Sequence, residues 1–134
     1  PRVAGGRVAV LIHLLGPKPY SELPGYAKRF DAAILPFVVN ELTLSANPLK
    51  VREYLAAGLP VVSTAIPEVE KLSDLLHIGR DHADFLGKLQ SIIDSGRVGP
   101  QISISQQMDV ESWDEKVEQL SRIFLNSSAN GLAA

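Results

Sequence analysis

Short apolar runs alternate with amphipathic stretches along this chain, and the alternation limits the possible folds more than any other feature. Four runs are rich in β-branched and aliphatic residues and are bounded by glycine, proline or charged residues, as buried strands are. They span Val8–Leu15, Asp31–Phe37, Leu59–Thr64 and Leu75–Gly79. Strands separated by helices pair in parallel, and helices cover both faces of a parallel sheet. We therefore predict an α/β fold with three layers, αβα, and a mostly parallel sheet.

Capping residues mark the helices between these runs. Asp81 is a suitable N-cap for a helix that ends near Ser95. Gly96 suits the left-handed residue that closes such a helix. A further helix is expected over Pro48–Ala57, and short ones from Ser21 and from Pro67, with a turn-like segment over Val38–Ala46 and no clear assignment for Gln101–Met108.

The last helix is predicted from the capping-box pattern Ser-x-x-Glu at Ser112–Glu115. Its apolar residues recur at helical spacing, so we expect them to face the core. We interpret the tryptophan in this stripe as a packing residue and not as a stacking platform. The expected core stripe consists of Val110, Trp113, Val117, Leu120 and Phe124.

The composition excludes several classes of site. The chain has 134 residues, a formal net charge of −2 and no cysteine. The charge argues against a nucleic-acid surface, and the missing cysteines exclude disulfides and thiolate metal sites. The histidines match no metal-ligand spacing, and no apolar run is long enough for a membrane span. We expect one domain over residues 1–126, a flexible tail over residues 127–134, and a cytoplasmic protein that could act at the membrane surface in a longer form.

The helix start at Asn47 suggests an anion site. Asn47 is a good N-cap and Pro48 a good first helical residue, which leaves the amides of Leu49 and Lys50 directed off the helix end. Lysine is unfavourable at this end of a helix by a few tenths of a kcal/mol. A bound anion would remove that penalty. The alternative is an ordinary solvated helix face.

Glu53 lies three residues after Lys50, on the same helix face. Lysine before glutamate is the poorer order for an intrahelical ion pair. A carboxylate one turn above a phosphate site could instead accept two hydrogen bonds from a ribose diol. The sequence alone leaves both interpretations of Glu53 open, since exposed charges need no special explanation.

Longer stretches resemble a known family. The segment "NPLKVREYLAAGLPVVST", from Asn47 to Thr64, is similar to the donor-binding stretch of GT-B glycosyltransferases, especially family 4 and its close relatives. The upstream segment "HLLGPKPYSELPGYAKRFDAAILPF" resembles the strand, glycine loop and helix that lead to the same site. The downstream segment "DVESWDEKVEQLSRIF" resembles the closing helix of the family. The resemblance covers about Val8 to Leu125.

The resemblance implies a Rossmann-like carboxyl-terminal domain that holds a nucleotide-diphospho-sugar as substrate, without a cofactor. It implies that Glu53 binds the donor ribose and that Lys50 is catalytic, because Lys50 would stabilise charge on the leaving diphosphate. The implied contacts to diphosphate and sugar are Asn47, Pro48, Leu49 and Lys50, and those near the base are Gly16, Pro17 and Tyr20.

Two departures from the family limit what is implied. Ser45 stands where many members have a glutamate that faces the donor sugar. The chain also has only "PRVAGGR" before its first predicted strand, and it contains no acceptor-binding domain. We therefore predict an incomplete GT-B domain whose partners are a nucleotide-sugar and a missing amino-terminal domain, and which does not catalyse transfer alone. The alternative is a non-catalytic α/β binding or interaction module that keeps the fold and could form a homodimer through an exposed sheet or helix surface.

Overall fold

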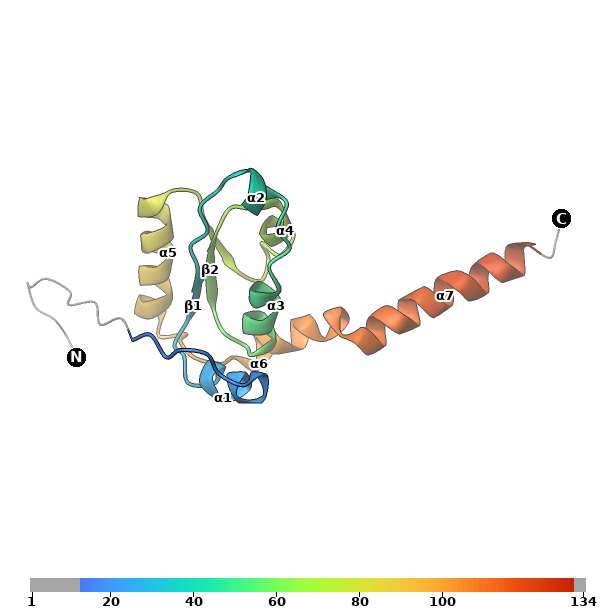
Figure 1. The fold of residues 1–134 in the computed structure, drawn as a ribbon, viewed down its shortest axis with the longest axis horizontal. Helices are drawn as coiled ribbons and strands as arrows, with labels where there is room; N and C mark the ends of the chain where they lie inside the picture. The colour runs from blue at the N-terminus through green and yellow to red at the C-terminus, as the bar shows by residue number, and fades with distance from the viewer. Residues whose placement is uncertain (1–12, 132–134) are drawn as a thin grey trace, which may run out of the picture.

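The computed structural model describes residues 13–131, with side chains described as far as residue 126. Three strands and several helices alternate along this part of the chain (Figure 1). The first half contains the 3₁₀-helix η1 (Tyr20–Glu22), α1 (Leu23–Ala27), β1 (Ala33–Leu35), α2 (Glu41–Leu44), α3 (Leu49–Ala56) and β2 (Val61–Thr64). The second half contains α4 (Pro67–Glu70), β3 (His77–Gly79), α5 (His82–Ser95), α6 (Ile102–Ser105), the 3₁₀-helix η2 (Gln106–Glu111) and α7 (Trp113–Gly131).

The three strands form a parallel sheet in the order β1-β2-β3. Ala33 pairs with Val61 and Leu35 with Ser63, while Thr64 pairs with Gly79. The sheet lies between two helical layers, since α5 packs on β2 and β3, and α3 and α4 lie on the opposite side of the strands (Figure 1). The predicted α/β fold with a parallel sheet and αβα layers is confirmed.

Apolar side chains form a separate cluster on each face of the sheet. The larger cluster lies on the α3 side, where Val51, Leu55 and Val69 pack against inward-facing strand residues. The smaller cluster joins Val62 of β2 to Phe85 and Ile92 of α5. Burial on both faces of β2 explains why the adjacent residues Val61 and Val62 are both apolar, although their side chains lie on opposite faces.

Helix α3 ends in a tight turn that connects it to β2. Gly58 has a positive φ of 79°. Its amide donates to the Leu55 carbonyl at 2.8 Å, and the Leu59 amide donates to the Tyr54 carbonyl at 3.0 Å. These are the two hydrogen bonds of a Schellman motif, which glycine accommodates without the steric penalty of a Cβ atom. The Gly58 carbonyl also accepts from the Gln101 amide at 2.8 Å, so the turn fixes the chain before α6.

The boundaries of α5 follow the capping residues in the sequence. The Asp81 side chain accepts a hydrogen bond from the Asp84 amide at 2.8 Å, as an N-cap does. Gly96 closes the helix in the left-handed conformation. Both predicted caps are confirmed, as are the predicted short helix from Pro67 and the strand that ends at Gly79.

The amino-terminal predictions hold less well. Most of the predicted strand Val8–Leu15 lies outside the described residues, but residues 13–15 are exposed and are not in a strand, so this part of the prediction is wrong. The short helix predicted from Ser21 is present as η1 and α1, but Ser21 is not its cap, because the N-cap residues are Pro19 and Glu22. The segment predicted as a turn contains α2, which the side chains of Asn40 and Thr43 cap reciprocally.

The prediction that α7 faces the core is wrong. Figure 1 shows that α7 extends away from the α/β body, while the segment that precedes α7 lies against that body. The Trp113 side chain is 82% exposed, and Val117 and Leu120 are each more than half exposed. The same holds for Val110 and Phe124, the other members of the predicted stripe. The apolar periodicity is present, but the described side chains of the stripe are largely exposed and do not form part of the core.

Within residues 13–131, no helix combines the length and the apolar character that a bilayer span requires. Helix α7 continues to Gly131, past the predicted end of the domain at residue 126. The division into a domain and a tail stays a prediction.

Candidate functional site

The start of α3 differs by one residue from the prediction. Pro48, not Asn47, is the N-cap residue, and Leu49 is the first helical residue. Asn47 does not cap the helix because its Oδ1 accepts a hydrogen bond from Arg52 Nη1 at 2.6 Å. Helix-start amides have no intrahelical acceptor, so those of Leu49 and Lys50 still face outward, as the sequence predicted.

Lys50 and Glu53 form an ion pair on the first turns of α3. Lys50 Nζ lies 2.9 Å from Glu53 Oε2, with side chains 55% and 24% exposed respectively. The sequence predicted little self-stabilisation for this pair, but the structure forms it. The hydrogen bond to Glu53 raises the pKa of Lys50 above its ordinary value, which favours the charged ammonium. A pair this exposed contributes little to folding stability.

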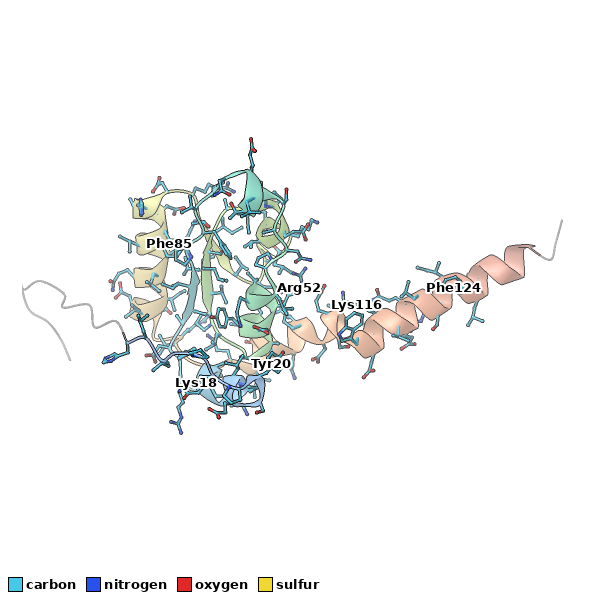
Figure 2. The ribbon with its side chains drawn as sticks, in the orientation of Figure 1. Lys18, Tyr20, Arg52, Phe85, Lys116 and Phe124 are labelled. Atoms are coloured by element: carbon cyan, nitrogen blue, oxygen red, sulfur yellow. The ribbon has the colours of Figure 1, made fainter. Side chains whose placement is uncertain are left out.

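Tyr20 brings a distant segment to the same carboxylate. Its hydroxyl donates to Glu53 Oε1 at 3.4 Å, a long and therefore weak hydrogen bond. Figure 2 shows Tyr20 on the segment that passes beside the end of the body, with Lys18 close by. The structure therefore brings together three residues that the sequence assigned to the candidate site: Tyr20, Lys50 and Glu53.

A cavity of about 520 Å³ opens between this segment and α3. Tyr20, Lys50 and Glu53 line it together with Gly16, which has a positive φ of 68°. Much of the remaining wall is aromatic or cationic. Those wall residues are Tyr26, Phe30, Tyr54, Lys18 and Lys28.

The aromatic wall also holds one of these cations. Lys18 Nζ lies 5.7 Å from the centre of the Tyr26 ring, within range of a cation–π interaction. The cavity therefore combines flat apolar surfaces with positive charge and a single carboxylate, Glu53. Such a combination suits a ligand with an aromatic ring, hydroxyl groups and negative charge.

A second cavity, of about 540 Å³, lies on the neighbouring face of α3. Leu49, Arg52 and Glu53 line it on the α3 side, and Asp109 and Glu111 line it from η2. Glu53 therefore stands on the ridge between the two cavities. Leu49 is the only residue from the predicted diphosphate segment 47–50 among the lining residues of this cavity.

The other residues predicted for the site do not line these two cavities. Ser45 caps the end of α2, where its hydroxyl donates to the Glu41 carbonyl at 3.4 Å. Pro17 is exposed beside Gly16, and Asn47 and Pro48 form the approach to α3. Their roles in ligand binding stay predictions.

Sequence reasoning missed residues that contact this region. Tyr26 and Phe30 carry no motif, and they reach the cavity only because the chain folds back under α3. Arg52 and Glu111 are 59 residues apart and form an ion pair at 3.3 Å. The sequence offers no signal for that pair, because it depends on where η2 packs.

Across residues 13–131, no group of three or more histidine, aspartate or glutamate side chains is arranged to hold a metal ion.

Comparison with known proteins gives one informative similarity. Over 82 residues the chain is 32% identical to a Bacillus subtilis (strain 168) protein named "Putative teichuronic acid biosynthesis glycosyltransferase TuaH". The match covers 58% of this chain and 21% of that protein, so the chain spans about a fifth of the relative's length. No protein-family model and no solved structure matches the chain. The similarity supports a glycosyltransferase-like domain.

Proposed function

We propose that this chain is the nucleotide-sugar donor-binding part of a GT-B glycosyltransferase, which moves a sugar from a nucleotide-diphospho-sugar to an acceptor. One observation carries the proposal. Glu53 lies at the rim of an aromatic cavity, one turn from a helix start, and meets both Lys50 and Tyr20. The similarity to a protein named as a glycosyltransferase points in the same direction.

Glu53 would bind the ribose of the donor. A carboxylate can accept a hydrogen bond from each hydroxyl of a cis-diol, and hydrogen bonds to charged groups contribute about 1.5–3 kcal/mol each. Glu53 already accepts at both of its oxygens, from Tyr20 at Oε1 and from Lys50 at Oε2. The diol would therefore replace or share these partners, and it would hold the nucleoside in a fixed orientation.

The aromatic cavity would hold the base. Tyr20, Tyr26 and Tyr54 present flat surfaces on which a base can stack, and the volume of about 520 Å³ is sufficient for a nucleoside. Stacking of a base on an aromatic ring is worth about 1–3 kcal/mol. This wall does not specify one base, because every base has a π-face.

Lys50 and the first amides of α3 would bind the diphosphate. When the bond between the sugar C1 and the diphosphate oxygen breaks, its electron pair stays on the diphosphate and negative charge grows there. A fixed cation and the helix dipole stabilise that charge. Lys50 is 55% exposed, so it is free to move from Glu53 toward the phosphates while the ribose hydroxyls take its place.

The proposal is tested by titrating uridine, guanosine and adenosine diphosphates into the chain and into its Glu53→Ala variant. Loss of the ribose contact should weaken binding about 10- to 100-fold. Glu68→Ala is a matched control, because Glu68 forms the equivalent i,i+3 pair with Lys71 away from the cavity.

A ligand lacking the diol makes the test specific. The unaltered chain should bind a 2′,3′-dideoxynucleoside diphosphate more weakly than the ribose form. The Glu53→Ala variant should bind the two ligands with equal affinity. An equal loss in both proteins would assign Glu53 a structural role and contradict the ribose assignment.

The second candidate is a non-catalytic module that keeps this fold. It is favoured by the Lys50–Glu53 pair, since each charge is already balanced by a neighbour within the protein. Under this alternative, none of the three nucleoside diphosphates binds at millimolar concentration.

A further inference from the structure

Arg52 connects two segments that flank the candidate site. Its Nη1 donates to Asn47 Oδ1 at 2.6 Å, and its Nε donates to Glu111 Oε2 at 3.3 Å. The Arg52 and Glu111 side chains are 24% and 30% exposed, so both are more enclosed than an ordinary surface pair. The guanidinium is planar and rigid, and it therefore holds its two acceptors in a fixed relation.

The Glu111 end of this connection is firmly placed. Met108, three residues earlier in η2, is buried in the larger core cluster, and the partly buried Ile104 of α6 packs against the same cluster. Lys116 Nζ donates to the same Glu111 oxygen at 3.1 Å. The Lys116 hydrogen bond, and then that of Arg52, lower the pKa of Glu111, which keeps it ionised. Figure 2 shows Arg52 and Lys116 on either side of the junction between the body and α7.

The Asn47 end of the connection is the approach to α3. Pro48 is the N-cap but makes no side-chain capping bond, and Asn47 is held by Arg52 rather than by helix amides. The backbone that directs the Leu49 and Lys50 amides is thus fixed from the side, by a residue whose own partner lies in η2.

We propose that Arg52 and Glu111 are positioning residues, and that the connection Glu111–Arg52–Asn47 sets the orientation of the first turn of α3 for an anionic ligand. The inference rests on the proposed function for its ligand, but the geometry of the connection does not. Through this connection the carboxyl-terminal segment influences the geometry of the donor site, although that segment supplies no group to the ligand.

The sign of one substitution separates positioning from simple charge effects. Glu111→Gln removes a negative charge near the helix start, so long-range electrostatics alone would strengthen binding of an anion. If Glu111 acts by holding Arg52, the same substitution weakens binding. We expect a 3- to 10-fold higher Kd for the nucleoside diphosphate that the unaltered chain binds best. An equal or lower Kd would overturn the proposal.

Asp109→Asn is the matched control. Asp109 lines the same cavity as Glu111 and carries the same charge, but its side chain is not bonded to Arg52. Its substitution should leave the Kd unchanged or lower it. A rise in Kd equal to that of Glu111→Gln would assign the effect to general loosening of η2, and would also overturn the proposal.

A double-mutant cycle tests the connection itself. Asn47→Ala and Glu111→Gln act on one chain of contacts, so their effects on Kd should be non-additive although the two residues do not touch. Arg52→Lys retains the positive charge but loses the planar guanidinium group. It should therefore raise the Kd as much as either single variant does. Additive effects on Kd, or a Kd for Arg52→Lys equal to that of the unaltered chain, would contradict the role assigned to Arg52.

A measurement without ligand separates this inference from the proposed function. In amide NMR spectra, Glu111→Gln should shift the Leu49 and Lys50 resonances, while Asp109→Asn should not. Unshifted resonances would overturn the positioning role. If the unaltered chain binds none of the three diphosphates but the resonances shift, the proposed function fails and the connection stands.

Discussion

Replacement of Gly58 by alanine should be one of the most damaging single changes in the chain. Gly58 has a φ of 79°, and a Cβ built on it would lie 2.6 Å from the Gln101 carbonyl oxygen and 2.8 Å from the Gln101 nitrogen. Both contacts are with backbone atoms, so no side-chain rotation relieves them. The turn after α3 and the segment before α6 would have to separate.

Three effects determine the magnitude. A residue with a side chain in the left-handed conformation costs about 1–2 kcal/mol. Overpacking costs about 1–3 kcal/mol, and loss of the Gln101–Gly58 hydrogen bond about 1 kcal/mol. We therefore expect Gly58→Ala to lower the free energy of unfolding by about 3–6 kcal/mol.

Gly96→Ala is the control, and urea denaturation followed by far-UV circular dichroism is the assay. Gly96 has a φ of 68°, but an added Cβ would meet no atom within 4 Å. Its substitution should cost only the conformational term, about 1–2 kcal/mol. With an m-value of about 2 kcal/mol per molar urea, the two midpoints should differ by about 1–2 M. Equal midpoints would show that the contact with Gln101 does not constrain the turn, and would refute the reasoning.

Three further predictions concern exposure, charge and pH. Trp113→Ala should change the free energy of unfolding by less than about 0.5 kcal/mol, whereas a buried tryptophan would cost about 3–5 kcal/mol in the same urea titration. Lys50→Gln should weaken binding of nucleoside diphosphates and reduce its salt dependence without changing the urea midpoint, and an unchanged Kd would remove Lys50 from the site. Lys116 and Arg52 lower the pKa of Glu111 in the folded chain. The difference in free energy of unfolding between the unaltered chain and Glu111→Gln should therefore be constant above the ordinary glutamate pKa. It should shrink as the pH falls through the lowered pKa of the folded chain. A difference that grows in acid, measured by urea titration across pH, would contradict this sign.

The sequence predicted the elements whose signals are local. The apolar runs that became β1, β2 and β3 and the caps at Asp81 and Gly96 depend on neighbouring residues alone, and the structure confirms them. The start of α3 shifted because a side chain from within the helix competes for the predicted N-cap residue. Asn47 has the chemistry of an N-cap, but Arg52 takes its side chain, and the helix starts one residue later than predicted.

The errors on α7 have a related cause. Periodicity identified an amphipathic helix around Trp113 but could not show what its apolar face contacts.

The candidate site shows the same division between local and distant information. Lys50 and Glu53 could be chosen from their spacing on one helix, whereas Tyr26 and Glu111 reach the site through tertiary packing. The ion pair between Lys50 and Glu53 also formed against the weak helix preference that argued otherwise.

The order of the sheet has a consequence for how the protein folds. Each strand pairs with the next strand in the sequence, so β2, α4, β3 and α5 can assemble with short loops and little loss of chain entropy. Attachment of η2 to α3 instead closes a loop between residues 52 and 111, and we expect it to be a late step. Hydrogen exchange should therefore show an opening in which the sheet remains protected while the carboxyl-terminal segment is released.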